Sequence, residues 1–277
     1  MRFDLLPRHI QRATALALGF ALTALGQSPT DVAKRFSGNW VEDQSKSTIG
    51  AARSLTFRKG SDGLEELRGT YARPLVQPVR FGTAPYTIDE SKNTLVWKDL
   101  GGGRFERTIA EGGKTVGIRH ITISADGKML TEVTEDTNRP NGKKSTTTIV
   151  YARTSGSGQQ LEGTWKPQSL RSDTPLSMSI EAAGGTLKIS RGTGVSNVLT
   201  FDGKPSNLTG PAVISGTTDA GKIISDRVIE IDGARMGTPS GVTTWTLSAD
   251  GKTLTSSAMT LGPEASKEPT VRVFQKK

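Results

Sequence analysis

Apolar and polar residues alternate along residues 38–153 in short runs separated by turns rich in Gly, Asp and Asn. Alternation with a period of two is typical of β-strands that bury one face. Successive runs begin roughly ten residues apart, the spacing of an antiparallel meander that forms a sandwich or a barrel. Beyond residue 26, no run has the period of an amphipathic helix. The predicted strands cover residues 38–42, 54–58, 64–71, 86–89, 94–98, 105–110, 116–124, 128–135 and 146–153.

The pattern occurs twice along the chain, which indicates an internal repeat. A Gly/Ser-rich segment, 154–160, lies between the two copies and has the composition of a flexible linker. The sequence therefore predicts a first β-barrel module over 34–153 and a second over 161–277. Three landmarks recur in the same order at offsets of 123 to 125 residues: 38–40 as 163–165, 121–131 as 245–255, and 150–153 as 273–276.

Each copy contains the segment Ser-Ala-Asp-Gly-Lys between two β-rich runs. This composition favours a tight hairpin in which Gly127 or Gly251 adopts a positive φ and the aspartate stabilises the turn. The recurrence of Asp126 and Asp250 is therefore interpreted as structural.

The apolar positions on either side of residues 119–120 do not share one face of a strand. Ile121 and Ile123 point to one side, whereas Val116 and Ile118 fall on the opposite parity. We therefore predict a β-bulge near residues 119–120 that switches the buried face.

The N-terminus carries three arginines within residues 1–12, followed by an uncharged apolar run of 14 residues and the small residues of Ala24-Leu25-Gly26. This order predicts a signal peptide over 1–26 and hence export to the periplasm or the medium. A run of 14 falls short of the roughly 20 residues needed to cross a bilayer. No later run approaches that length, so we expect no membrane-spanning segment.

Composition narrows the possible functions. The formal net charge of +9 is scattered without long runs of one sign, and the basic stripe with interleaved aromatics that nucleic-acid binding requires is missing from the sequence. There is no Cys, and of the two His residues His9 lies in the leader and only His120 remains. The usual zinc and two-histidine iron sites are therefore excluded, and we expect no cofactor.

Catalytic patterns are weak. A Ser-His-Asp triad would need His120, and no Gly-x-Ser-x-Gly segment accompanies it, so His120 is interpreted as an ordinary strand residue. Adjacent carboxylates at 65–66, 89–90 and 135–136 could suggest a glycosidase. Neighbours on a strand point to opposite faces, so these pairs are interpreted as solvated surface charge. The sequence predicts no catalytic residue.

A Gly-x-Trp strand followed by an antiparallel meander resembles the lipocalin and calycin group. The resemblance implies an all-β fold of two tandem barrels in which Trp40 and Trp165 close the floors. It also implies that a basic residue near the last strand stacks on each indole. Arg153 and Lys276 occupy the matching places, each shortly after an aromatic residue. A cation over an indole face is attracted to the ring.

The whole copy also resembles a family of exported bacterial proteins, common in acidobacteria-like genomes, that has no assigned activity. The resemblance rests on Asp43-Gln44-Ser45-Lys46, on Phe201-Asp202-Gly203-Lys204-Pro205 and on the two late hairpins. Copies of about 115 residues are shorter than typical lipocalins and lack their C-terminal helix, which disfavours a deep hydrophobic calyx.

These observations favour an exported, non-enzymatic, monomeric protein whose barrels bind a small or apolar ligand, if they bind one. One alternative is a carboxylate-based hydrolase or isomerase that works inside a barrel. Another is a structural or adhesive envelope module with filled barrels. Because the second copy has diverged, as where Thr238 takes the place of Lys114, we expect only one copy to hold a site.

Overall fold

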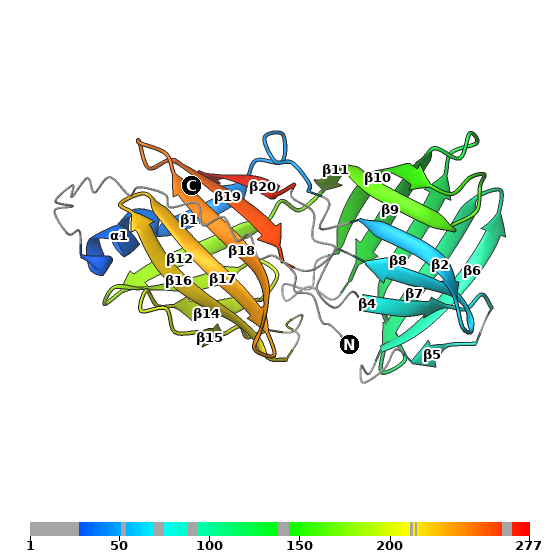
Figure 1. Ribbon diagram of the computed structural model, residues 1–277, viewed down its shortest axis with the longest axis horizontal. Coiled ribbons are helices and arrows are strands. Elements are labelled where there is room, and N and C mark those ends of the chain that lie inside the picture. Colours follow the sequence, from blue (N-terminus) through cyan, green and yellow to red (C-terminus); the bar gives the residue numbers. More distant parts are fainter. Residues whose placement is uncertain are drawn as a thin grey trace, which may run out of the picture.

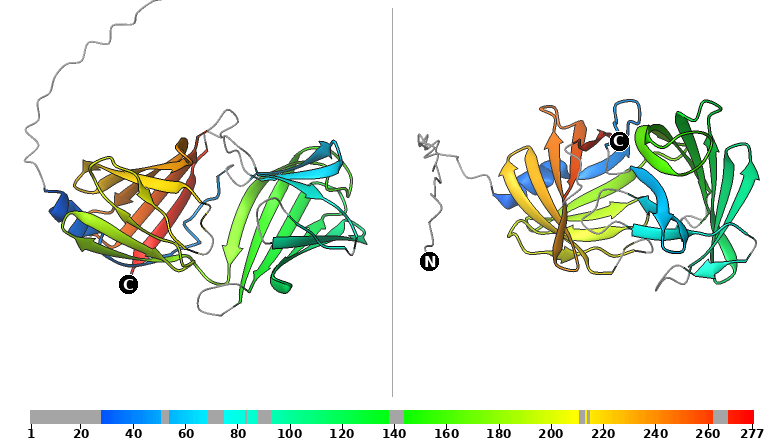
Figure 2. Two further views of the ribbon diagram at one scale, coloured as in Figure 1. Left: turned by 90° about the horizontal axis from the view of Figure 1, so that it is seen from below. Right: turned by 45° about the vertical axis from the view of Figure 1, so that its right-hand side comes forward.

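A computed structural model describes residues 28–50, 54–68, 75–82, 84–87, 93–137, 144–210, 213, 215–261 and 268–277. The predicted signal peptide lies outside these residues. The protein is all-β and contains two ten-stranded antiparallel sheets, each of which curves into a barrel-like shape (Figures 1 and 2). The predicted fold class is confirmed.

The barrel formed by the middle of the chain has the strand order β4-β3-β2-β11-β10-β9-β8-β7-β6-β5, and we call it the middle barrel. Its strands are β2 (Leu55–Gly60), β3 (Gly63–Arg68), β4 (Leu75–Val79), β5 (Tyr86–Thr87), β6 (Asn93–Gly101), β7 (Arg104–Glu111), β8 (Lys114–Ile123), β9 (Met129–Asp136), β10 (Ser145–Ser155) and β11 (Gly163–Ser172).

The other barrel combines the two ends of the chain in the order β14-β13-β12-β1-β20-β19-β18-β17-β16-β15, and we call it the terminal barrel. Its strands are β1 (Gly38–Glu42), β12 (Ser177–Ala183), β13 (Thr186–Arg191), β14 (Ser196–Leu199), β15 (Ser206–Asn207), β16 (Thr217–Ser225), β17 (Val228–Arg235), β18 (Thr238–Leu247), β19 (Thr253–Thr260) and β20 (Thr270–Lys276).

The two Gly-x-Trp strands are exchanged between the barrels. Trp40 on β1 pairs with Met178 of β12 and Lys276 of β20, so β1 completes the terminal barrel. Trp165 on β11 pairs with Leu55 of β2 and Arg153 of β10, so β11 completes the middle barrel. The linker over 154–160 therefore does not separate the two sheets, and the modules 34–153 and 161–277 do not coincide with the barrels.

Short connections explain the exchange. Residues 156–162 join β10 to β11 as a hairpin, so β11 pairs with the strand that directly precedes it. The chain then crosses to the terminal barrel within the four residues 173–176, whereas residues 43–54 lead from β1 to the middle barrel. The first crossing contacts the end of β11, where the second begins, because the Gln44 side chain exchanges two hydrogen bonds of 2.7 Å with the backbone of Ser172.

One helix, α1 (Pro29–Phe36), precedes β1 and corrects the expectation that no helix follows residue 26. Ser28 caps its N-terminus, and Pro29 occupies the first turn, where the missing N–H costs no hydrogen bond. Val32 and Phe36 are fully buried against one end of the terminal barrel. With eight residues, α1 is too short for a helical period to stand out, and it is stabilised by this packing.

The two Ser-Ala-Asp-Gly-Lys hairpins have the predicted geometry, with φ of 71° at Gly127 and 69° at Gly251. The carboxylate of Asp126 accepts hydrogen bonds from the Ser124 hydroxyl at 2.6 Å and the Lys128 backbone N–H at 3.0 Å. Asp250 makes the same two contacts in its own hairpin.

The interiors of the barrels differ. Large apolar side chains fill most of the terminal barrel: Trp40, Ile180, Leu187, Ile189, Leu199, Ile229, Ile231, Trp245, Leu247 and Leu254. This barrel also buries Glu42 of β1, which pairs with Arg272 of β20 at 2.6 Å. The middle barrel has an apolar core around Phe57, Trp97, Leu130, Tyr151 and Trp165. Beside this core it also buries four charged residues, Glu66, Arg107, Arg119 and Glu132.

Candidate functional site

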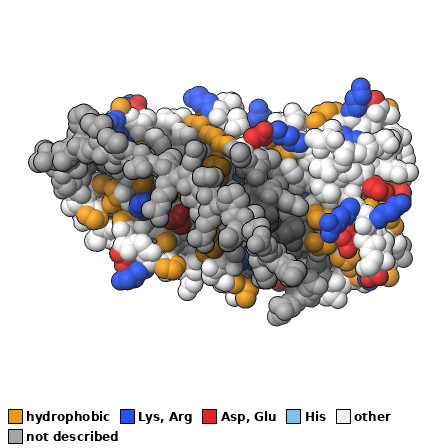
Figure 3. All heavy atoms as spheres, viewed as in Figure 1, with side chains coloured by type: hydrophobic (Ala, Val, Ile, Leu, Met, Phe, Trp, Pro, Cys, Tyr) orange, Lys and Arg blue, Asp and Glu red, His pale blue; other side chains and the backbone are white. Residues whose placement is uncertain are grey.

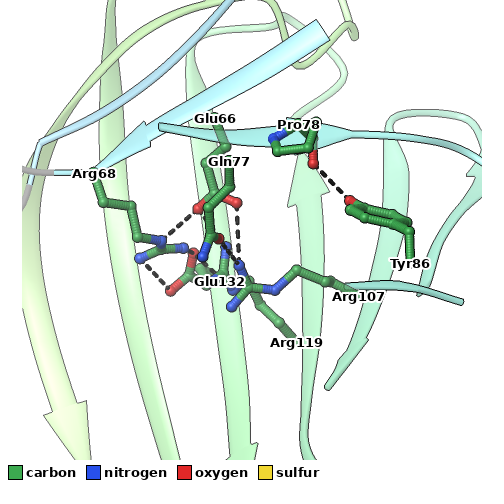
Figure 4. A network of polar contacts seen from close by, with 8 residues as sticks. All are labelled: Glu66, Arg68, Gln77, Pro78, Tyr86, Arg107, Arg119 and Glu132. Atoms are coloured by element: carbon green, nitrogen blue, oxygen red, sulfur yellow. Dashed lines mark hydrogen bonds and ion pairs between the residues drawn. The ribbon is translucent and has the colours of Figure 1, made fainter. Parts of the chain in front are cut away.

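A cluster of five charged side chains lies inside the middle barrel (Figure 4). It consists of Glu66, Arg68, Arg107, Arg119 and Glu132, which we call the arginine cluster. Its residues come from four strands, β3, β7, β8 and β9, and they share the inward-facing parity with apolar neighbours. The barrel fold thus brings together charges up to 66 positions apart in the chain.

Glu66 lies at the centre of the cluster and is only 1% exposed. It accepts hydrogen bonds from all three arginines: from Arg68 Nε, from Arg107 Nη1 at 3.1 Å and from Arg119 Nη1 at 2.8 Å. A carboxylate that accepts several charge-assisted bonds is held in its ionised form.

Glu132 is the second buried anion, and two of the arginines share it. Arg68 Nη2 donates to it at 2.5 Å, and Arg119 Nε forms an ion pair with it at 3.5 Å. Arg107 forms no ion pair with Glu132 among the described residues. Its second acceptor is the side-chain oxygen of Gln77 at 3.2 Å.

The neighbouring charges shift the acid–base equilibria of the cluster. Burial by itself raises the pKa of Glu66 and Glu132, but the nearby Arg119 and Arg68 outweigh it, so both pKa values lie below their usual range. For Arg107, burial and the adjacent Arg119 lower the pKa to about 9. Glu66 and Glu132 are therefore ionised at neutral pH, and an arginine side chain keeps its charge in proteins, so among the described residues three cations face two anions.

Three buried nitrogen donors lack a hydrogen-bond acceptor among the described residues: Arg107 Nε, Trp97 Nε1 and Arg119 Nε. Arg119 Nε still lies 3.5 Å from the Glu132 carboxylate, whereas no ion pair or hydrogen bond joins Arg107 Nε or Trp97 Nε1 to an anion among these residues. Trp97 and Arg107 are cross-strand partners on β6 and β7, and the guanidinium carbon lies 5.7 Å from the indole centroid. Buried donors are normally paired, and each exception calls for an explanation.

The terminal barrel has lost most of this cluster. The repeat aligns β8 and β9 with β18 and β19, and the strand pairing then identifies the matching positions in the other strands. Only the arginine at the edge of the cluster is kept, as Arg191. The residues in place of Glu66, Arg107, Arg119 and Glu132 are Ile189, Ile231, Thr243 and Ser256.

The four residues that the sequence singled out form two separate cation–indole pairs. The Arg153 guanidinium carbon lies 3.9 Å from the Trp165 ring centroid, and Lys276 Nζ lies 5.3 Å from that of Trp40. Both indoles are fully buried, and each donates to a backbone carbonyl four residues earlier. Arg153 also donates to four backbone carbonyls of the β8–β9 and β10–β11 turns.

Sequence analysis missed the cluster because it predicted the wrong buried face for one strand. The register shift lies between Ile109 and Ala110, opposite residues 115–117 of β8, and the strand then keeps one parity to Ile123. The predicted bulge is present, but it lies at residues 115–117 rather than near 119–120. Because no bulge lies at 119–120, Ile118 is displaced from the fully buried face and Arg119 points inward.

The adjacent glutamates at positions 65 and 66 do point to opposite faces, as predicted. Glu65 lies on the outside, where it pairs with Arg58, but Glu66 is buried, which corrects its interpretation as surface charge. A signal for this was available in the sequence, because Glu66, Arg107 and Glu132 each lie two residues from a core apolar residue of the same strand. Residues 89–90 lie outside the described residues.

Other candidate chemistry is dispersed. His120 is partly exposed on the outside of β8, where its Nδ1 lies 3.7 Å from Glu106. In the part of the chain that the structure describes, no three His, Cys, Asp or Glu residues come together as metal ligands.

On the face shown in Figure 3, Lys and Arg side chains lie among Asp and Glu rather than in one patch. Across the described ranges, no helix is long and apolar enough to cross a membrane.

Two surface clefts lie at the Trp165 end of the middle barrel, with volumes of about 470 and 580 Å³. Both are lined by Gln160 and Glu162 of the β10–β11 connection, and the larger also by Phe81 and Phe105. No residue of the arginine cluster lines either cleft. The cluster lies in the interior of the middle barrel, away from these surface clefts.

Comparison of the chain with protein-family models, with curated proteins and with solved structures finds no match.

Proposed function

We propose that the protein is an exported binding protein, without enzymatic activity, that holds a small or apolar ligand inside the middle barrel against the arginine cluster. One observation carries the proposal: four charged residues occupy interior positions that the terminal barrel fills with Ile189, Ile231, Thr243 and Ser256. Both barrels have the same strand order and hairpins, so the fold itself does not require the charges.

Energetic arguments support this assignment. Replacing a buried ion network with apolar residues of similar volume is often neutral or stabilising, because desolvation of the charges offsets their attraction. The terminal barrel has apolar or neutral residues at four of the five cluster positions and an ion pair elsewhere, between Glu42 and Arg272. A network at these positions in one barrel only is therefore better explained by binding than by stability. Polar groups that converge within an apolar interior are typical of ligand sites.

The rival enzymatic function is disfavoured by the state of the two carboxylates. A glycosidase of the usual kind needs one carboxylic acid with a raised pKa that donates a proton and a second carboxylate that stays ionised. Glu66 and Glu132 both have lowered pKa values because arginines contact them. Neither residue then holds a proton to donate at neutral pH.

The test compares the full chain with a variant in which the middle barrel carries the residues of the terminal barrel, E66I/R107I/R119T/E132S. Both proteins are purified natively from the same host, denatured and analysed by mass spectrometry for released small molecules. We expect a molecule stoichiometric with the native protein and absent from the variant.

Two outcomes would contradict the proposal. If both proteins release the same molecule in equal amounts, the ligand binds elsewhere. If neither releases one, and a panel of amphiphiles leaves the unfolding temperature of both unchanged, the middle barrel is a filled structural module. Circular dichroism of the variant establishes that it is folded, as the terminal barrel's own use of these residues leads us to expect.

A further inference from the structure

We propose that Arg107 and Trp97 form the recognition point for a single anionic group, of carboxylate or halide chemistry, inside the middle barrel. This inference rests on the proposed function and names the chemical group that the ligand presents. It is carried by the charge balance of the arginine cluster and by the donors that its protein acceptors leave unused.

The charge balance leaves one positive charge uncompensated. Arg68 and Arg119 each contact both Glu66 and Glu132, so the two carboxylates are shared between these two cations. Of the two carboxylates, Arg107 reaches only Glu66, at 3.1 Å from Oε2; its other acceptor is the neutral amide oxygen of Gln77, and Arg107 is 6% exposed. A buried charge is strongly disfavoured unless it is paired, and here the missing partner is one negative charge.

The unused donors indicate where that charge would bind. Three of the four tryptophans donate their indole N–H to an acceptor, at 3.0 to 3.1 Å, namely Trp40, Trp165 and Trp245. Trp97, which is fully buried, is the exception within the described ranges, and Arg107 Nε beside it also lacks an acceptor there. Both groups can only donate, so the group that satisfies them must accept.

The terminal barrel lacks this arrangement. Gly221 and Ile231 form the cross-strand pair that matches Trp97 and Arg107, so the indole and the guanidinium are lost together. Arg191, which matches Arg68, is instead paired within the barrel with Asn197 and Asp219. An uncompensated cation beside a free indole N–H is thus specific to the middle barrel.

The experiment follows the four indole N–H signals of the ¹⁵N-labelled full chain by NMR, with Trp97 assigned from the W97F variant. The chain is titrated separately with sodium chloride, sodium acetate and sodium dodecanoate at constant ionic strength, and with dodecanol as an uncharged analogue. We expect a saturable shift of the Trp97 signal with at least one of the three anions. The signals of Trp40, Trp165 and Trp245 should stay in place.

Two variants test the residues. R107I, which has the residue of the terminal barrel, should weaken anion binding by about tenfold or more, because a charge-assisted hydrogen bond and its charge are lost. W97F should weaken it by about threefold, as expected for loss of one neutral hydrogen bond. R104I, the same exchange at an exposed position of β7, should leave the affinity unchanged.

The outcomes separate this inference from the proposed function. Binding of dodecanoate and dodecanol with equal affinity, unaffected by R107I, would overturn the inference and leave the proposed function standing. A Trp97 shift with chloride or acetate but with neither amphiphile would support a free-anion site and count against an apolar ligand. If no anion moves the Trp97 signal, the inference is wrong.

Discussion

The two barrels share one topology and differ in what they bury. Each is a ten-stranded antiparallel sheet that contains one Gly-x-Trp strand and nine strands consecutive in the chain. The Gly-x-Trp strand joins the two ends of that series: β11 lies between β2 and β10, and β1 lies between β12 and β20. The terminal barrel is packed mainly with apolar side chains and closed at one end by α1. The middle barrel buries the arginine cluster, and its corresponding end is closed by the β10–β11 connection that Arg153 holds.

This comparison separates features of the fold from features of one barrel. The cation over the indole of the Gly-x-Trp strand, the indole bond to a carbonyl and the Asp-Gly hairpin occur in both barrels. The arginine cluster occurs in one, whereas the terminal barrel has separate ion pairs, such as Arg272 with Glu42 at 2.6 Å and Arg191 with Asp219 at 3.8 Å. Experiments that perturb one barrel while the other serves as an internal reference can therefore test the distinction.

The largest expected effect comes from removing a strand. A fragment of residues 54–172 retains all ten strands of the middle barrel and should unfold cooperatively. A fragment of residues 54–160 lacks β11, and with it the fully buried Leu161 and Trp165. Each such side chain contributes about 1.5–3 kcal/mol, a large share of a domain's stability, so the shorter fragment should not fold. Circular dichroism and thermal melts check this, and equal stability of the two fragments would contradict the observed exchange.

Loss of one anion from the cluster should be the next largest effect. Glu66→Gln leaves three buried arginines with one carboxylate and should destabilise the middle barrel by about 3–5 kcal/mol. The quadruple variant E66I/R107I/R119T/E132S should lose much less stability, because the buried anions and cations are removed together. Only Arg68 is left without its carboxylates, and its side chain is partly exposed to solvent. Chemical denaturation monitored for each barrel measures both. A single and a quadruple variant of equal stability would refute the argument.

Acid should weaken the middle barrel before the terminal barrel. The pKa values of Glu66 and Glu132 are lowered on folding, so their contribution is present above the unfolded value of about 4.5 and is lost as pH falls below it. At pH 3 a carboxylate with a strongly lowered pKa has lost about 2 kcal/mol of its contribution. In the terminal barrel, burial raises the pKa of Asp219, so acid favours the folded form at that site. Hydrogen exchange at pH 3 and pH 7 compares the barrels, and earlier acid unfolding of the terminal barrel would contradict this assignment.

The smallest expected difference concerns the two cations over the indoles. Arg153→Ala removes a contact of 3.9 Å to Trp165 together with four bonds to carbonyls and should cost about 2 kcal/mol. Lys276→Ala removes a contact of 5.3 Å to Trp40 and should cost about 0.5–1 kcal/mol. Thermal melts of the two variants give the comparison. A larger loss for Lys276→Ala would show that the stack, rather than the carbonyl bonds, stabilises this end of each barrel.

The local sequence determined most of the elements of this protein. Alternation with a period of two, together with Gly and Asp in the turns, predicted the strands and the repeat, because both depend on residues a few positions apart. Two elements were not predicted: the short helix α1, and β4 (Leu75–Val79), which contains Pro78, a residue that strands usually exclude. Trp40, Trp165, Arg153 and Lys276 were singled out by a resemblance to the lipocalin and calycin group, together with their matching places in the repeat.

Only the tertiary structure decided which strand completes which barrel and which charges meet inside. The sequences of β1 and β11 do not reveal which barrel each strand completes, because both are Gly-x-Trp strands and both take the same place in the strand order. The choice depends on connections such as residues 173–176 and on the contact of Gln44 with Ser172. The inward position of Arg119 likewise depends on where the bulge in β8 lies. It lies at residues 115–117 rather than near 119–120, and a change of register by one residue reverses the buried face of a strand.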